Sequence, residues 1–86
     1  MPEISRFFGI IIRMFFGEHN PPHIHAEYQG SKAVFDFAGN MVRGSLGSRT
    51  AVRLVRDWID LHGPELWADW ELARSGKDLR PIAPLE

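Results

Sequence analysis

The sequence contains no cysteine among its 86 residues. Disulfide bonds and thiolate metal ligands are therefore excluded, and any bound metal would rely on nitrogen and oxygen ligands. The chain also lacks a large net charge, because ten basic and eleven acidic residues give a formal charge of -1. A protein that binds nucleic acid through charge over its whole surface needs a clear excess of lysine and arginine, so only a local basic stripe could serve here.

The sequence also has no apolar run long enough to span a bilayer, which takes about 20 residues. The longest candidate, residues 7–16, is interrupted by Gly9 and Arg13, and no small-residue cleavage site follows it. We therefore expect no membrane segment and a cytoplasmic location, which the absence of cysteine favours. With 44% hydrophobic residues the chain has the composition of a folded protein, and its length predicts a single domain over residues 1–86.

The first half of the sequence has the pattern of strands and the second half that of helices, with the change near Gly47 and Ser48. Residues 4–8 and 10–16 are rich in β-branched and aromatic side chains, and the second of these segments is apolar on both faces, as in a central strand. We predict an α+β domain with a small antiparallel sheet of four to five strands followed by a C-terminal helical hairpin. Its parts are a β-rich half (1–47), the helical hairpin (48–76) and an extended tail (77–86).

Residues 23–28 and 32–37 alternate apolar and polar side chains on either side of a turn that contains Gly30. If Gln29 and Gly30 form a two-residue loop, His25 lies opposite Val34 and His23 lies opposite Asp36. One face of this hairpin is then polar and carries His23, His25, Glu27, Lys32 and Asp36. The other face is apolar, suited to packing under helices, and carries Ile24, Ala26, Tyr28, Ala33, Phe35 and Phe37.

The second half of the sequence has the signals of two helices. Ser48 is typical of an N-cap, and apolar residues recur after it at helical spacing as far as His62. Gly63 predicts the end of this helix in a left-handed conformation, and Pro64 predicts the start of the next. Because the three tryptophans fall on the apolar stripes of these helices, we expect all of them in the core: Trp58, Trp67 and Trp70.

Three of the four histidines lie within seven residues, in the segment His19-Asn20-Pro21-Pro22-His23-Ile24-His25. Histidine titrates near neutral pH and is the commonest metal ligand. In a strand His23, His25 and Glu27 share one face, but the outer two would lie ~13 Å apart, too far for one ion. A better metal-binding set is His23, His25 and either His19 or Asp36. Such ligands suit a divalent transition metal such as zinc.

Two other interpretations of the histidines remain open. In the first, His23 and His25 exchange protons with RNA or another phosphodiester, His19 assists, and Lys32 or Arg13 stabilises the negative charge. No serine or cysteine nucleophile accompanies the histidines in a recognisable pattern, which disfavours a hydrolytic triad. In the second interpretation the cluster is structural: His19 caps the loop, His23 pairs with Asp36, and His25 lies on an exposed face of the sheet.

Arg49, Arg53 and Arg56 recur at helical spacing and form a stripe on the polar side of the first predicted helix. Such a stripe is most often a solvated surface. It is also the natural contact for RNA or an acidic partner protein, because arginine binds phosphate and carboxylate bidentately. An uncovered strand at the edge of the predicted sheet would favour pairing with a second copy of the chain, so a homo-oligomer is a further expectation.

Four segments of the chain resemble the bacterial domain-of-unknown-function family DUF4160: MPEISRFFGIIIRM, HNPPHIH, AEYQGSKAVFD and WELARSGKDLRPIAPLE. The likeness extends over nearly the whole chain. Its His-x-Pro-Pro-His-x-His element corresponds here to His19, Pro21, Pro22, His23 and His25. The resemblance implies a small cognate partner protein, because genes of this family often lie beside a second small gene and are candidates for toxin–antitoxin pairs. It implies no activity and no catalytic role for any residue.

Overall fold

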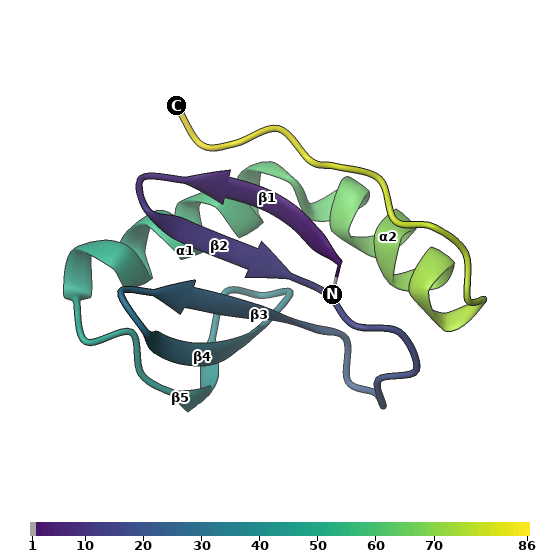
Figure 1. Cartoon of the computed structure of the whole chain (residues 1–86), viewed down its shortest axis with the longest axis horizontal. Coiled ribbons are helices and arrows are strands. Elements are labelled where there is room, and N and C mark those ends of the chain that lie inside the picture. Colours follow the sequence, from purple (N-terminus) through teal and green to yellow (C-terminus); the bar gives the residue numbers. More distant parts are fainter. Residues whose placement is uncertain (1) are drawn as a thin grey trace.

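The computed structural model describes residues 2–86. Five strands form one antiparallel sheet in which each strand pairs with the next along the chain. They are β1 (Glu3–Phe7), β2 (Ile10–Arg13), β3 (His23–Tyr28), β4 (Ser31–Asp36) and β5 (Met41–Gly44). Two helices follow and cover one face of the sheet (Figure 1): α1 (Arg49–Leu61) and α2 (Gly63–Arg74). The predicted α+β fold is confirmed.

The hairpin of β3 and β4 has the predicted register. His25 lies opposite Val34 and His23 opposite Asp36, so that Gln29 and Gly30 form the two-residue loop. Both loop residues have positive φ angles, 48° and 83°, as a type I′ turn requires. A shift by one residue would bring the histidines to the buried face, so the apolar alternation holds this register in place.

The face of the sheet beneath the helices forms the core. Four of the six predicted apolar residues of the hairpin are buried, namely Ile24, Ala26, Ala33 and Phe35, and Tyr28 and Phe37 are partly buried. Trp58 and Trp70 are also buried, as predicted, but Trp67 is 52% exposed. The prediction for Trp67 is wrong because α2 directs the face that carries Leu66 and Trp70, four residues apart, toward the core. The ring of Trp67 instead packs edge-on against Phe37.

The two helices meet at a sharp break. Ser48 caps α1, because its Oγ accepts a hydrogen bond from the backbone N–H of Ala51 at 3.1 Å. The expected left-handed Gly63 is wrong: His62, with a φ of -118°, separates the helices, and Gly63 is the first residue of α2. Pro64 follows at a position where its missing N–H leaves no helical bond unmade. Within residues 2–86, neither helix has the length and apolar character needed to cross a membrane.

The segment after α2 runs along β1 (Figure 1). The N–H of Ile82 donates to the carbonyl of Ile4 at 2.7 Å, and the indole Nε1 of Trp58 donates to the carbonyl of Ala83 at 2.9 Å. Ile82 itself is buried in the core. The tail therefore covers the outer edge of β1, whereas the outer edge of β5 has no neighbour within the described residues.

Asp69 of α2 is a carboxyl group with only 1% of its surface exposed. Its Oδ1 accepts the N–H of Arg80 in the tail at 3.0 Å, while Oδ2 has no hydrogen-bond partner in the described structure. Burial raises the pKa of Asp69 by more than the hydrogen bond and the charge of Arg80 lower it. Between the ordinary and the raised pKa, the folded protein holds a proton that the unfolded chain has lost.

The free energy of unfolding should therefore fall as pH rises through the interval between these two pKa values. In Asp69→Asn the acceptor oxygen is kept but nothing titrates, so this part of the pH dependence should vanish and the variant should be the more stable protein near neutral pH. Urea unfolding of both proteins between about pH 4 and about pH 7 measures the difference. If the free energy of unfolding changes with pH equally in both proteins, Asp69 is not the cause of this pH dependence.

Candidate metal centre

The histidine cluster lies where the loop after β2 leads into β3. This loop turns at Gly17, which has a φ of 70°, and its Asn20–Pro21 peptide bond is cis. The chain returns so that Glu18 faces the start of β3, where His23 and His25 project. The two histidines are two residues apart in a strand and therefore share one face, as the sequence predicts.

Glu18, His23 and His25 form a compact group, which we call the triad. Each offers one ligand atom, and these atoms lie within 4.8 Å of one another. Nε2 of His25 is 3.0 Å from Oε1 of Glu18, and Nε2 of His23 is 3.5 Å from Oε2. Ligand atoms bound to a tetrahedral zinc ion at ~2.0–2.1 Å are roughly 3.3 Å from one another. The two separations from Glu18 are therefore close to those around a single bound ion, and the group as a whole could hold one.

A backbone carbonyl fixes the orientation of His23. Its Nδ1 is 2.8 Å from the carbonyl oxygen of Pro21, a group that only accepts hydrogen bonds, so Nδ1 carries the proton. In the neutral ring Nε2 then has a free lone pair, and this lone pair faces the carboxylate of Glu18. The two negative centres repel unless a proton or a metal ion lies between them. Ligand histidines in metal sites are usually oriented by such a second hydrogen bond.

Aromatic contacts hold both imidazole rings in place. His25 packs edge-on against Phe15 with ring centroids 4.5 Å apart, and His23 lies 5.4 Å from the buried Trp70. Between 16% and 30% of the side-chain surface of each triad residue is exposed. Partial burial lowers the local dielectric constant and so strengthens the attraction between the carboxylate and a cation. The triad is thus preorganised yet open to solvent on one side.

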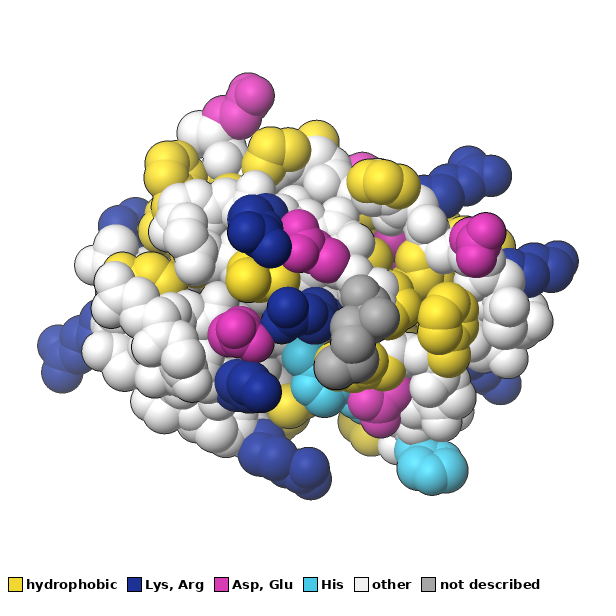
Figure 2. Space-filling view, viewed as in Figure 1, with side chains coloured by type: hydrophobic (Ala, Val, Ile, Leu, Met, Phe, Trp, Pro, Cys, Tyr) yellow, Lys and Arg dark blue, Asp and Glu magenta, His cyan; other side chains and the backbone are white. Residues whose placement is uncertain are grey.

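A cavity of about 550 Å³ opens beside the triad. Three protein ligands leave coordination positions free for water or a substrate, and this cavity gives room for one. Figure 2 shows histidines in cyan beside a line of basic side chains on the open face of the sheet. Besides the triad, the cavity is lined by His19, Asn20, Pro21, Val34, Asp36, Val42 and Arg43.

His19 and Asp36, the sequence-based candidates for the third ligand, both line the cavity but lie outside the triad. The carboxylate of Asp36 accepts hydrogen bonds from Ala38 and Asn40 in the turn before β5. Partial burial alone would raise the pKa of Asp36, but these hydrogen bonds outweigh it and hold the pKa below its usual value. Glu18 provides the third possible ligand atom instead. The only indication of this in the sequence is that a carboxylate stands directly before His19.

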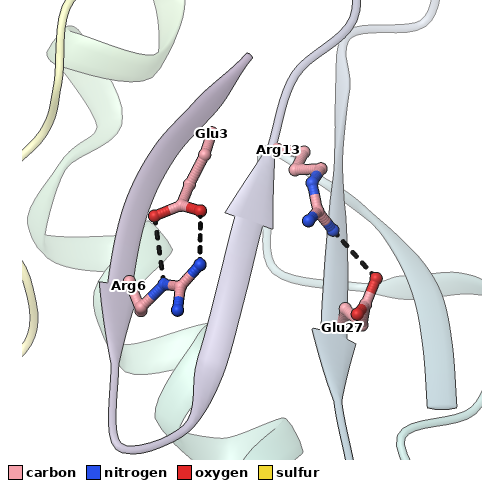
Figure 3. A network of polar contacts seen from close by, with 4 residues as sticks. All are labelled: Glu3, Arg6, Arg13 and Glu27. Carbon is pink, nitrogen blue, oxygen red and sulfur yellow. Dashed lines mark hydrogen bonds and ion pairs between the residues drawn. The ribbon is translucent and has the colours of Figure 1, made fainter. Parts of the chain in front are cut away.

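Two arginines on the open face of the sheet are paired with carboxylates (Figure 3). Arg6 binds both oxygens of Glu3 at 2.7 and 3.1 Å, and Arg13 binds Glu27 at 2.8 Å. Since Glu27 is engaged by Arg13, it is not available to the triad. The Arg6–Glu3 pair is exposed and contributes little to stability, whereas the Arg13–Glu27 pair is partly buried; both pairs neutralise their arginines.

Arg43 is the cation that lines the cavity. It lies opposite Val34, which in turn lies opposite His25, so the three side chains form a row across β5, β4 and β3. Within residues 2–86 no carboxylate lies within 4.0 Å of its guanidinium. Lys32 and Arg13, which the sequence indicates for this role, lie on the same face but outside the cavity lining.

Two further predicted features lie away from the triad. Arg49, Arg53 and Arg56 are exposed on α1 and line a different cavity, of about 460 Å³. The fourth histidine, His62, contacts the carboxylate of Glu65 at 2.8 Å between the helices. This second imidazole–carboxylate pair contains one histidine only and provides a matched control for the triad.

A comparison with protein families matches residues 9–71 to the domain of unknown function DUF4160. The matched region contains the triad, the cavity beside it and the arginines of α1. No curated protein and no solved structure matches the chain. Because the matched region covers well over half of its length, the chain belongs to the DUF4160 family.

Proposed function

We propose that this protein binds one divalent transition metal ion through Glu18, His23 and His25 and uses it to hydrolyse a phosphodiester. The observation that carries the proposal is the convergence of two Nε2 atoms on one carboxylate, at 3.0 and 3.5 Å. Two imidazoles and one carboxylate are the ligand set of hydrolytic zinc sites and of non-haem iron(II) sites. Zinc is the simplest occupant, because hydrolysis needs no change of oxidation state.

The chemistry follows from the open coordination positions. Bound zinc would lower the pKa of a coordinated water to about 7 and so would supply a nucleophile near neutral pH. Its attack on phosphorus would form one P–O bond and break another, and the leaving oxygen would take up a proton. His19, on the rim of the cavity, is a donor for that proton.

Arg43 supports a phosphodiester as the substrate. Its guanidinium lines the cavity beside the triad and has no carboxylate partner within residues 2–86, and a guanidinium binds phosphate bidentately. RNA is a substrate of this class. An RNA hydrolase held inactive by a small partner protein would be a toxin–antitoxin pair, the arrangement that the family resemblance implies.

A second function uses the same residues without a metal. The Glu18 carboxylate contacts both imidazoles and holds the two rings close together. His23 and His25 would then exchange protons with RNA, and Arg43 would stabilise the negative charge on phosphate. In this case Glu18 positions the histidines and binds nothing else.

Elemental analysis and RNA cleavage by the untagged protein separate these functions. We expect close to one equivalent of metal per chain, and cleavage that a chelator abolishes and added metal restores. A polyhistidine tag must be absent because it supplies ligands of its own. Metal-free protein that cleaves RNA in the presence of a chelator would establish the second function. Stoichiometric metal without cleavage of any phosphodiester would reduce the protein to a non-catalytic metal-binding module.

A further inference from the structure

The two edge strands of the sheet differ in how the rest of the described chain covers them. The tail covers β1 and pairs with it through the N–H of Ile82. All four residues of β5 are exposed, and no segment within residues 2–86 pairs with its outer side. An uncovered edge strand presents unpaired N–H and C=O groups, which another chain can extend into a further strand.

Two cavities that share Arg49 and Val52 of α1 lie near the open edge of β5. The first, of about 430 Å³, is lined by the half-exposed Met41 of β5. The second, of about 460 Å³, is lined by the three arginines of α1. We call the two together the β5–α1 groove. It offers an apolar floor next to a strand edge.

Arg49 is the charged residue that lines the cavity next to β5, and Arg53 and Arg56 follow it along α1. Arg49, Arg53 and Arg56 have no carboxylate within 4.0 Å in the described part of the chain. Asp57 and Asp60 also line the groove, but they lie roughly 12 and 16 Å beyond Arg49 along the axis of α1. A ligand that pairs with β5 therefore meets arginine first.

We propose that the β5–α1 groove binds an extended segment of a partner protein that adds a strand to β5 and directs acidic side chains at Arg49 and Arg53. Main-chain hydrogen bonds to β5 supply binding energy, and the cavity at Met41 accepts an apolar side chain. The arginines select the partner, because carboxylates pair bidentately with guanidinium groups. This surface is separate from the triad, so the proposal stands whether or not the triad binds a metal.

Two other occupants fit this surface less well. A second copy of the chain that pairs β5 with β5 about a two-fold axis would place Arg43 within one or two residues of its own counterpart, and like charges opposite each other in a sheet repel. Nucleic acid would make no use of the strand edge or of the apolar cavity at Met41. The strand edge, the apolar floor and the arginines together favour an acidic β-strand.

The test uses a synthetic peptide of about ten residues that alternates valine and glutamate, and a control peptide that alternates valine and lysine. Amide chemical shifts and hydrogen exchange of the whole protein report where each peptide binds. We expect the glutamate peptide to shift the amides of β5 and the start of α1 and to slow exchange in β5. The lysine peptide should not bind.

Charge reversal tests the role of the arginines. Arg49→Glu combined with Arg53→Glu should weaken binding of the glutamate peptide by about tenfold or more, since two charge pairs become repulsive. The exposed Arg74 of α2 provides the control, and Arg74→Glu should change affinity less than about twofold. If the double variant is not folded by circular dichroism, neutral glutamine at both positions replaces it.

Three results would overturn the proposal. The first is that the glutamate peptide does not use this surface, seen either as no shifts in β5 and α1 or as unchanged affinity in the folded double variant. The second is a dimer in sedimentation analysis that Val42→Glu dissociates, which would show that a second copy of the chain occupies the groove. The third is an oligouridylate that displaces the glutamate peptide and shifts the same amides, which would show that nucleic acid occupies the groove.

Discussion

His23→Ala and His25→Ala are each expected to lower the affinity of the protein for zinc by about 100-fold or more. Loss of a residue that is hydrogen-bonded to a metal ligand already reduces metal affinity by about 10- to 100-fold. Loss of the ligand itself should reduce metal affinity further. Glu18→Gln keeps the shape of the side chain but removes its charge, and the same direction of change is expected. Neither histidine is a member of the hydrophobic core, but His23 contacts the buried Trp70, so the folding of His23→Ala has to be checked.

His62→Ala and Glu65→Gln are the matched controls, because they break an imidazole–carboxylate contact of 2.8 Å that has no second histidine. Neither should alter zinc affinity, and His19→Ala should alter it only slightly. Calorimetric titration of untagged, metal-stripped protein measures all of these variants, and circular dichroism confirms their folding. Wild-type affinity in His23→Ala, or an equal loss in His62→Ala, would remove the triad as the metal site.

The fold could be predicted from the sequence because a buried face determines the register of a strand. Ile24 and Phe35 must lie under the helices, and this requirement fixes which face carries His23 and His25. The two-residue loop at Gln29 then sets every pair along the hairpin. The exposure of Trp67 could not be predicted in this way because the apolar stripe of a helix is broad, and a residue at the edge of the stripe can be either buried or exposed.

The candidate site could be predicted only in part. Strand spacing placed His23 and His25 together and excluded Glu27 from the same ion, and the structure pairs Glu27 with Arg13. Glu18 was missed because its position depends on the turn of the loop at Gly17, and periodicity carries no information about a loop conformation. Arg43 was missed because its row depends on an irregularity in the register between Val34 and Phe35.

Gly44 sets the end of β5, and Gly44→Ala is expected to reduce the free energy of unfolding by about 3 kcal/mol. Gly44 has a φ of 77°, a left-handed conformation that disfavours any side chain by roughly 1–2 kcal/mol. An added Cβ would also clash with the backbone carbonyl oxygen of Lys32 and lie 3.0 Å from the Cα of Ala33. Neither neighbour can yield, since both belong to β4, and such overpacking adds roughly 1–3 kcal/mol.

Gly30→Ala separates the two contributions. Gly30 has a similar φ of 83°, but a Cβ there would meet nothing within 4 Å, so only the conformational cost of roughly 1–2 kcal/mol applies. Urea unfolding of the two variants measures the difference, and an equal loss of stability in both would contradict the clash at Lys32. Arg43 and the open sheet edge belong to β5, whereas the triad lies on β3 and the loop before it. Displacement of β5 in Gly44→Ala should therefore impair substrate binding and partner binding but leave metal binding unchanged. A variant that loses all three together would instead show that the sheet as a whole supports the triad.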